Sequence, residues 1–217
     1  MTGKSKATTA SERYEEYLRT RPKQSRSRGV VEAIFTAARE ALTRGEREDR
    51  LTLQWVAERA GVGIGSLYDY FGDRASVLAG LTAKITDDNL RELQSELEKT
   101  ESMSLEEGLH HLVDVIFDKY LPSSTTLSRA ILRVAHRTDL MPMLAENQTL
   151  FAQALATSLR RRADVRLADP ELTAWTLTQM VMGVVHTLTW MSDPPFTREA
   201  IAREMVHVAH AALSHEK

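Results

Sequence analysis

The chain has 217 residues, 42% of them apolar and 27% charged, and these fractions are typical of a globular protein with a buried core. It contains no cysteine, which excludes disulfide frameworks, thiolate catalysis and cysteine–metal sites. No apolar run reaches the roughly 18 residues that a membrane span needs, and the N-terminus lacks the apolar core of a signal peptide. We therefore expect a cytoplasmic protein without a membrane partner.

The net charge of −2 is divided unevenly along the chain. Residues 1–30 hold eight Lys or Arg and three Glu, a net charge of +5, so the remainder carries −7. A basic start on an acidic body favours local contact with phosphates over general binding to polyanions. We interpret residues 1–18 as a solvated tail, and we expect residues 21–28 to contact phosphates. Residues 1–26 are thus predicted to form a basic flexible arm.

Apolar residues at helical spacing predict a first helix over residues 27–44, followed by a charged loop that starts at Gly45. The stretch from Leu51 to Phe71 then predicts two short helices joined by a tight turn. Thr52 can cap the first of them, and Gly61 supplies the left-handed backbone conformation that ends it. In the second helix Leu67 and Phe71 face inward. This helix–turn–helix pattern is typical of proteins that present the second helix to the major groove of DNA.

The run from Ala60 to Phe71, followed by Arg74 and Leu78, resembles the DNA-binding signature of TetR-type (tetracycline-repressor-like) transcriptional regulators, and the detailed match covers residues 27–81. The resemblance implies an all-α fold of about nine helices. It implies a three-helix DNA-binding domain at residues 27–72, with the helix–turn–helix at residues 52–71. Residues 73–217 would form a larger helical domain for effector binding and dimerisation.

The resemblance also implies which residues contact DNA. Gly63 replaces the family's usual serine and removes a hydroxyl, while Ile64 replaces a polar or basic residue and can read only shape or a thymine methyl group. Arg74 stands where a phosphate-binding lysine is common and keeps the charge. The expected DNA contacts are Arg26, Arg28, Thr52, Gly63, Ile64, Gly65, Ser66, Tyr68, Asp69, Tyr70 and Arg74. Two of these residues have an alternative role: Tyr68 would pack in part against the first helix, and Asp69 would be a solvated carboxylate without a DNA contact.

Further helices follow to the end of the chain, and no segment predicts a strand. Asp73 is expected to cap a helix that continues through Leu97, and Ser104 with Glu107 forms a capping box. A long helix ends in a basic triplet at residues 160–162, which complements the helix dipole. Asp169, followed by proline, starts a helix that runs to about Met191, and a last helix begins near residue 197.

The helix at residues 170–191 is almost uncharged, so it must be covered on most sides. One chain covers one face, and we expect a second copy to cover the other, because the family dimerises through its last two helices. The expected dimer interface comprises Leu177, Val181, Val184, Leu188, Ile201, Met205, Val208, Ala209 and Leu213. The family also implies a small-molecule pocket, for which the candidates are Phe117, Tyr120, Phe151, Trp175, Gln179, Met182, His186 and Trp190. Core packing remains the alternative for each of these candidates.

The predicted function is a ligand-responsive regulator, most simply a repressor. It would bind a pseudo-palindromic DNA operator as a homodimer and be released by a small apolar or amphipathic effector. The alternative is a DNA-binding adaptor or architectural protein without an effector. An enzyme is disfavoured, because the sequence has no phosphate-binding loop, nucleophile motif or metal constellation. His207 and His210 have a spacing that could share a metal but lack a third ligand, so we predict no metal and no cofactor.

Overall fold

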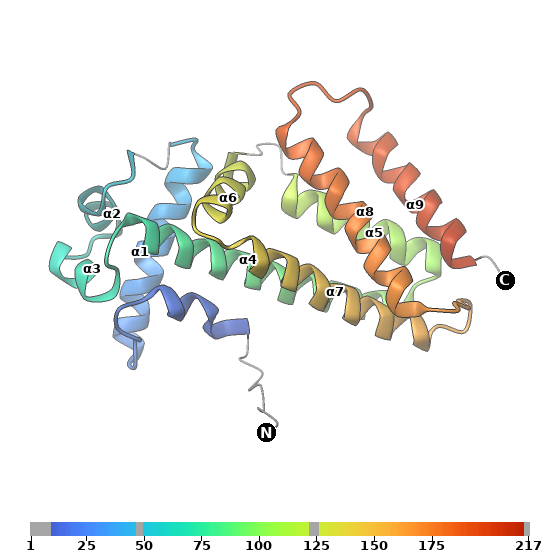
Figure 1. The fold of residues 1–217 in the computed structure, drawn as a ribbon, viewed down its shortest axis with the longest axis horizontal. Coiled ribbons are helices and arrows are strands. Elements are labelled where there is room, and N and C mark those ends of the chain that lie inside the picture. The colour runs from blue at the N-terminus through green and yellow to red at the C-terminus, as the bar shows by residue number, and fades with distance from the viewer. Residues whose placement is uncertain (1–9, 47–49, 122–125, 215–217) are drawn as a thin grey trace. The chain divides into compact units, whose positions relative to one another are not determined.

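A computed structural model describes residues 10–46, 50–121 and 126–214, and within these ranges the chain is helical, with turns and no strand (Figure 1). The all-α prediction is confirmed. None of the helices in the described ranges is long and apolar enough to cross a membrane. The elements are η1 (Ala10–Tyr17), α1 (Ser25–Thr43), α2 (Leu53–Ala60), α3 (Ile64–Tyr70), α4 (Arg74–Lys99), η3 (Thr100–Ser102), α5 (Leu105–Tyr120), α6 (Thr126–Arg137), α7 (Met141–Arg161), α8 (Pro170–Trp190) and α9 (Arg198–Ser214).

The helix starts that the sequence predicts from capping residues are present. In each of four helices the N-cap side chain accepts a hydrogen bond from the backbone N–H three residues further on, at 2.7–3.3 Å. The bond satisfies one of the N–H groups that the first turn of a helix leaves without a partner. These caps depend only on residues within one turn, which is why the sequence predicts them. They are Thr52, Asp73, Ser104 and Asp169.

The chain forms two compact units whose boundary differs from the predicted one at residue 72. The first unit comprises Met1–Asp88 with Arg129–Met141, and the second comprises Asn89–Ser128 with Pro142–Lys217. The first half of α4 belongs to the first unit because it packs against α1. Gly80 of α4 lies so close to α1 that a Cβ atom there would be 3.1 Å from Phe35 Cζ. Because glycine has no Cβ atom, the two helices can approach each other closely at Gly80.

The segment that we predict as a flexible arm, residues 1–26, has secondary structure and tertiary contacts over the part that the structure describes. Residues 10–17 form the 3₁₀ helix η1, and α1 begins at Ser25. Tyr14 meets Phe35 of α1 edge to face, with ring centroids 5.6 Å apart. The prediction relied on charge alone, and charge does not reveal aromatic anchoring.

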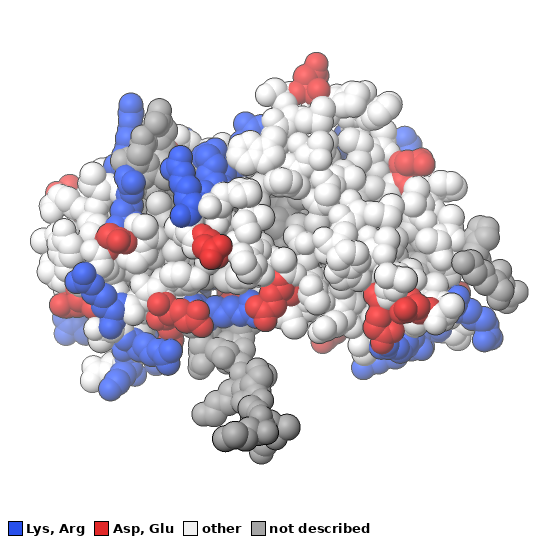
Figure 2. Space-filling model, viewed as in Figure 1, with Lys and Arg blue, Asp and Glu red and all other residues white. Residues whose placement is uncertain are grey.

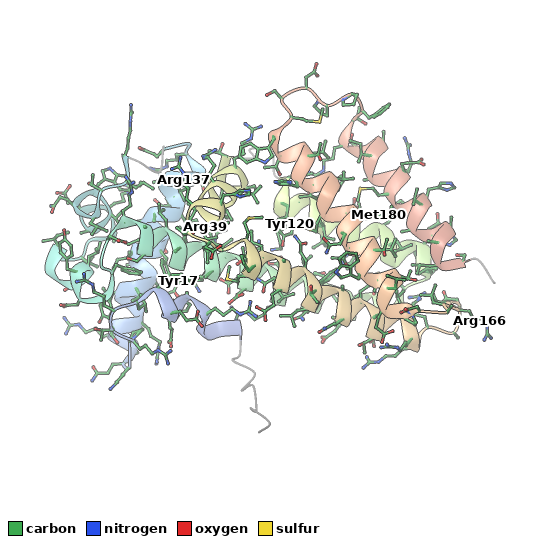
Figure 3. All side chains as sticks on the ribbon, in the orientation of Figure 1. Tyr17, Arg39, Tyr120, Arg137, Arg166 and Met180 are labelled. Atoms are coloured by element: carbon green, nitrogen blue, oxygen red, sulfur yellow. The ribbon has the colours of Figure 1, made fainter. Side chains whose placement is uncertain are left out.

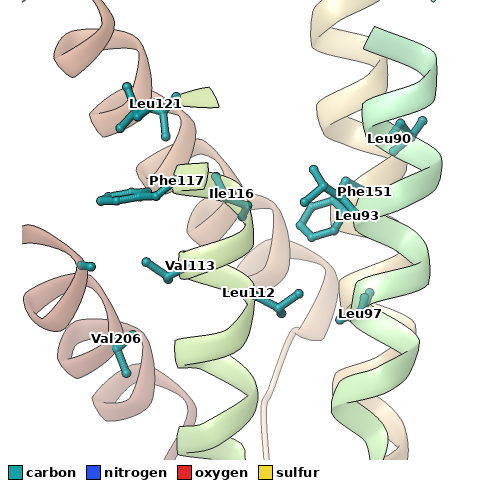
Figure 4. Packing of buried hydrophobic residues seen from close by; sticks show 12 residues of the cluster. Leu90, Leu93, Leu97, Leu112, Val113, Ile116, Phe117, Leu121, Phe151 and Val206 are labelled. Atoms are coloured by element: carbon teal, nitrogen blue, oxygen red, sulfur yellow. The ribbon is translucent and has the colours of Figure 1, made fainter. Parts of the chain in front are cut away.

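The second unit has a core of leucine, valine and phenylalanine side chains from α4, α5, α7, α8 and α9 (Figure 4). Phe117 of α5 is fully buried in it, and Phe151 of α7 is nearly so. Helices α5 and α9 pack against each other. Each buried side chain of this size contributes about 1.5–3 kcal/mol to folding through removal of apolar surface from water.

Candidate nucleic-acid interface

The turn between α2 and α3 fixes where the second helix starts. Gly61 has φ 65° and ψ 28°, the left-handed conformation that favours glycine. The next N–H, of Val62, donates to the carbonyl oxygen of Ala57 at 3.0 Å, which closes the C-terminus of α2. Gly63 then adopts an extended backbone and precedes α3 as its N-cap. The predicted glycine turn is therefore present.

Two buried side chains determine which face of α3 reaches solvent. Leu67 and Phe71 are fully buried, and the Phe71 ring meets Phe35 of α1 with ring centroids 5.6 Å apart. On the opposite side Gly65, Ser66 and Asp69 are exposed. A short helix with one buried and one exposed side is the arrangement with which helix–turn–helix proteins read base edges.

The two departures from the family pattern lie at the start of α3. Gly63 makes no side-chain cap, and the position of its missing Cβ is 4.0 Å from Ser66 Oγ. Ser66 therefore offers the hydroxyl nearest to the turn. Ile64 is partly buried, so only part of its side chain is free to contact a base.

The other predicted DNA contacts belong to the same compact unit. Tyr68 is half exposed, and Tyr70 is partly buried. Arg74 is the exposed first residue of α4, and Arg26 and Arg28 are exposed near the start of α1. On the face shown in Figure 2, Lys and Arg side chains gather over the helices of this unit.

Thr52 is exposed, and its Oγ1 accepts the hydrogen bond from the Trp55 N–H at 3.2 Å. Because a hydroxyl both donates and accepts, the capping bond leaves its proton available to a phosphate oxygen. The DNA role of Thr52, like those of the other ten residues, stays a prediction.

Sequence reasoning missed one residue in contact with α3. The backbone N–H of Arg19 donates to the carbonyl oxygen of Tyr70 at 2.8 Å. The two residues are far apart in sequence, so no local pattern could have predicted the bond. The one sequence signal in the N-terminal segment is the spacing of Tyr14 and Tyr17. Two aromatic residues three positions apart lie on the same side of a helical turn and can pack against another element.

The structure does not bring all eight predicted pocket residues together. Phe117 and Phe151 are buried in the core of the second unit, and Tyr120 packs against that core (Figure 3). Burial raises the pKa of the Tyr120 hydroxyl to about 12, and a hydrogen bond with Asn89 opposes the rise. The five pocket candidates on α8 fall into two groups. Gln179 and Met182 are partly buried, whereas Trp175, His186 and Trp190 are exposed.

The predicted dimer residues lie mostly against the chain's own core. Leu177 and Leu213 are buried and Ala209 packs beside them, while Val181, Val184, Leu188, Ile201 and Met205 pack against the cluster of Figure 4. Val208 is the one of the nine with an exposed side chain. A helix that is almost uncharged on every side does not indicate which face turns inward.

The exposed face of α8 is instead aromatic and sulfur-rich. Leu172 is 60% exposed, Trp175 and Met180 are each 47% exposed, and Trp190 is 44% exposed. Met180 is labelled on α8 in Figure 3. The exposed residues of this helix follow one another every three or four positions and form one stripe with Trp175; they are Leu172, Thr176, Met180, Gly183, Thr187 and Trp190. Large apolar side chains exposed on one side of a helix make that side a candidate interaction surface.

The histidines do not assemble a metal site in the part of the chain that the structure describes, where no three His, Asp or Glu side chains converge. His111 Nε2 lies 2.8 Å from Glu96 Oε2, so its partner is a carboxylate on α4. His210 is near the Ser214 hydroxyl at 3.3 Å.

Two family profiles match the chain. The profile described as bacterial regulatory proteins of the tetR family matches residues 34–81, and the tetracyclin repressor-like C-terminal domain matches residues 104–213. The chain belongs to the TetR family. It is a DNA-binding transcriptional regulator, and the first profile spans the whole of α2, the turn and α3.

Solved structures of other TetR-family proteins have the same fold. A protein from Mesorhizobium loti MAFF303099 assigned to this family is 18% identical, with a TM-score of 0.71, 88% of this chain and 100% of that chain being covered. SmeT, the repressor of the multidrug efflux pump SmeDEF of Stenotrophomonas maltophilia, is 22% identical with a TM-score of 0.59, covering 86% and 91%. The multidrug binding protein EbrR, complexed with imidazole, is 14% identical with a TM-score of 0.57, covering 86% and 96%. None of the curated proteins matches the sequence.

Proposed function

We propose that this TetR-family regulator is a ligand-responsive repressor that binds a pseudo-palindromic operator as a homodimer. A small apolar or amphipathic effector would release it from DNA. Because its operator would lie on the chromosome of a bacterium, we propose the cytoplasm as its compartment. The observation that carries the proposal is α3, a recognition helix with Leu67 and Phe71 buried behind it and Ser66 and Asp69 exposed in front.

The contacts to DNA follow from the positions of the exposed groups. Ser66 and Ile64 lie in the first turn of α3, whose N-terminal residues reach base edges in proteins of this kind. Arg74, Arg26 and Arg28 would bind phosphates, which fixes the register of the protein on the duplex without reading its sequence.

A two-fold dimer is supported by the exposed stripe of α8. The stripe surrounds Gly183, beside which no atom lies within 4 Å of the position that a Cβ would take. A glycine in such a place lets the backbone of a second helix approach closely. Because a two-fold interface uses the same patch on both subunits, Trp175 and Trp190 of each chain would be buried at once. We therefore assign the dimer contact to this stripe and to Val208 of α9, in place of the residues that pack inward.

An effector is supported by two relatives of the same fold. SmeT is a repressor of a multidrug efflux pump and has been solved in a complex with triclosan, and EbrR is a multidrug binding protein. In the present chain the candidate lining is Phe117, Tyr120 and Phe151 at the core, together with the partly buried Met182 and Gln179 of α8. Aromatic rings beside one buried hydroxyl suit a small aromatic ligand with one polar group.

Helix α4 is the proposed route between effector and DNA. Its first half belongs to the unit that holds α3, and its second half contributes Leu90, Leu93 and Leu97 to the core of the other unit. A ligand that displaces this second half would change the separation of the two recognition helices in the dimer. Couplings of this type are typically about 1–3 kcal/mol.

Selection from a random pool of duplexes with the purified native chain tests the DNA proposal. We expect enrichment of a pseudo-palindrome whose half-sites lie about one helical turn apart, roughly 34–36 Å. Failure to enrich any two-fold sequence at low salt would overturn the proposal of a dimeric operator reader.

The architectural alternative would have the same recognition helix but no effector pocket in its core. The complete burial of Phe117 favours a filled core over a large open cavity at that residue. Thermal unfolding in the presence of small aromatic compounds separates the two proposals. A ligand that binds only the folded state raises the melting temperature, by an amount that grows with its concentration over its Kd. A compound that raises the melting temperature and also releases the selected duplex supports the effector. A ligand that binds without changing DNA affinity supports the alternative.

A further inference from the structure

The N-terminal segment comprising residues 13–24, here named the brace, follows directly on the start of the blue ribbon in Figure 1. It makes three kinds of contact within the first unit. It packs against α1 through the edge-to-face pair of Tyr14 and Phe35, with an interplanar angle of 85°. It packs against α4 through Tyr17, whose Cβ is 3.5 Å from the position of a Cβ on Gly80 (Figure 3). A segment with such contacts is a packed element of the unit.

A charge pair extends the contact between the brace and α4. Arg13 Nη1 lies 3.7 Å from Asp87 Oδ1, and the Asp87 side chain is only 2% exposed. A buried carboxylate requires a compensating cation, because transfer of an isolated charge out of water is costly. Lys84 lies over the Tyr14 ring, with Nζ 5.8 Å from the ring centroid. The brace therefore has a defined place on the surface of α4.

The third contact is with the C-terminal end of the recognition helix. The Arg19 N–H donates to the carbonyl oxygen of Tyr70, the last residue of α3, at 2.8 Å. The Arg19 guanidinium covers Gly72, since its Nε is 2.9 Å from the position where a Cβ would stand. The last four carbonyl groups of a helix have no partner within the helix, and the brace supplies one.

The brace is also linked to the ring behind α3 through Phe35 of α1. Tyr14 packs on Phe35, and Phe35 packs on Phe71, the residue that follows α3, again at 5.6 Å between centroids. Helix α3 has seven residues, too few for a helix to be stable on its own in water. Its position thus depends on what packs around it, and the brace holds both its main-chain end and the ring behind it.

We propose that the brace is a positioning element for the recognition helix, and that Tyr14 and Arg19 raise operator affinity by holding the end of α3 in place. The inference rests on the DNA-binding function proposed above. A helix already held in its bound position loses less conformational entropy when it enters the groove. Tyr14 and Arg19 are positioning residues: the brace acts on α3, whether or not its own charges touch DNA.

Two full-length variants separate positioning from charge. Tyr14→Ala removes the aromatic anchor and keeps every Lys and Arg. Lys23→Gln with Arg26→Gln removes two exposed positive charges and leaves the packing of Tyr14 in place. The probes are the duplex selected by the native chain and a shuffled duplex of the same composition, measured by fluorescence anisotropy over a range of salt concentrations.

For Tyr14→Ala we expect roughly tenfold weaker binding to the selected duplex, the effect of one lost aromatic pair in each subunit. Binding to the shuffled duplex and the dependence on salt should stay as in the native chain. The charge variant should weaken binding to both duplexes and reduce the salt slope by about 2 for each chain, since two phosphate contacts are lost. Tyr14→Phe keeps the ring edge and should restore native binding.

Amide hydrogen exchange without DNA gives an independent result. In Tyr14→Ala the amides of Arg19 and α3 should exchange faster, while those of α8 stay unchanged. The proposal is overturned if folded Tyr14→Ala keeps native exchange at α3, or keeps the native ratio of affinities for the two duplexes. If the native chain selects no duplex, the DNA-binding proposal fails, and the exchange measurement still decides whether the brace holds α3.

Discussion

Truncation of Trp175 on the exposed face of α8 tests the proposed dimer. Trp175 is 47% exposed in the single chain, and a two-fold dimer through this stripe would cover it in both subunits. The variant Trp175→Ala removes the side chain without adding a charge. Because nearly half of the ring is already in solvent, the fold of the chain should lose little stability.

The size of the effect follows from the exposed area. A tryptophan offers roughly 250 Å², so 47% exposure leaves about 120 Å² for burial. At about 25 cal/mol per Å² this amounts to about 3 kcal/mol, and alanine keeps a small part of it. With about 2.5 kcal/mol lost from each of two chains, the dimer should weaken by about 5 kcal/mol. Since each 1.4 kcal/mol is tenfold, its Kd should rise by roughly three to four orders of magnitude.

Sedimentation velocity over a range of protein concentrations measures this change. Tyr68→Ala is a matched control, because Tyr68 is an aromatic of the DNA-binding unit with almost the same exposure, 48%. The control should remain as dimeric as the native chain and lose affinity for DNA. A Trp175→Ala variant with an unchanged dimer Kd would refute the assignment of the interface to this face, and a native chain that is monomeric at micromolar concentration would refute the dimer.

Three further predictions concern single residues. Thr52→Ala should lower the free energy of unfolding by about 1 kcal/mol in urea titrations, because the first turn of α2 loses its cap, whereas Thr52→Ser should retain it. Ile64 or Ser66 substitutions should change the sequences enriched from a random pool, whereas Arg74→Ala should weaken binding to all sequences alike. Burial raises the pKa of Tyr120 from 10.0 to about 12, so the stability that it contributes is complete below pH 10 and is lost as the pH rises toward 12. The melting temperature of Tyr120→Phe should therefore fall less between pH 10 and pH 12 than that of the native chain.

The features that the sequence predicted correctly are local ones. A cap such as Thr52 and a left-handed glycine such as Gly61 each act within four or five residues, so their residue types and spacing are sufficient. The same holds for Leu67 and Phe71, whose spacing of four places both on the buried side of α3.

The features that the sequence did not predict depend on contacts between distant segments. An uncharged helix such as α8 carries no polar face to indicate its rotation, and packing of Leu177 and Val185 into the core turns Trp175 outward. The basic composition of residues 1–26 predicts a flexible arm. Tyr14 nevertheless packs on Phe35, which lies 21 residues further along the chain. Such pairings are set by tertiary packing, which overrides composition.

The central claim is that two copies of α3, related by a two-fold axis, read one operator. Insertion of five base pairs between the half-sites of the selected duplex tests it most directly, because about half a helical turn moves the half-sites to opposite faces of the DNA. We expect affinity for this duplex to fall to that of a duplex with a single half-site. Unchanged affinity for the five-base-pair insertion would contradict it.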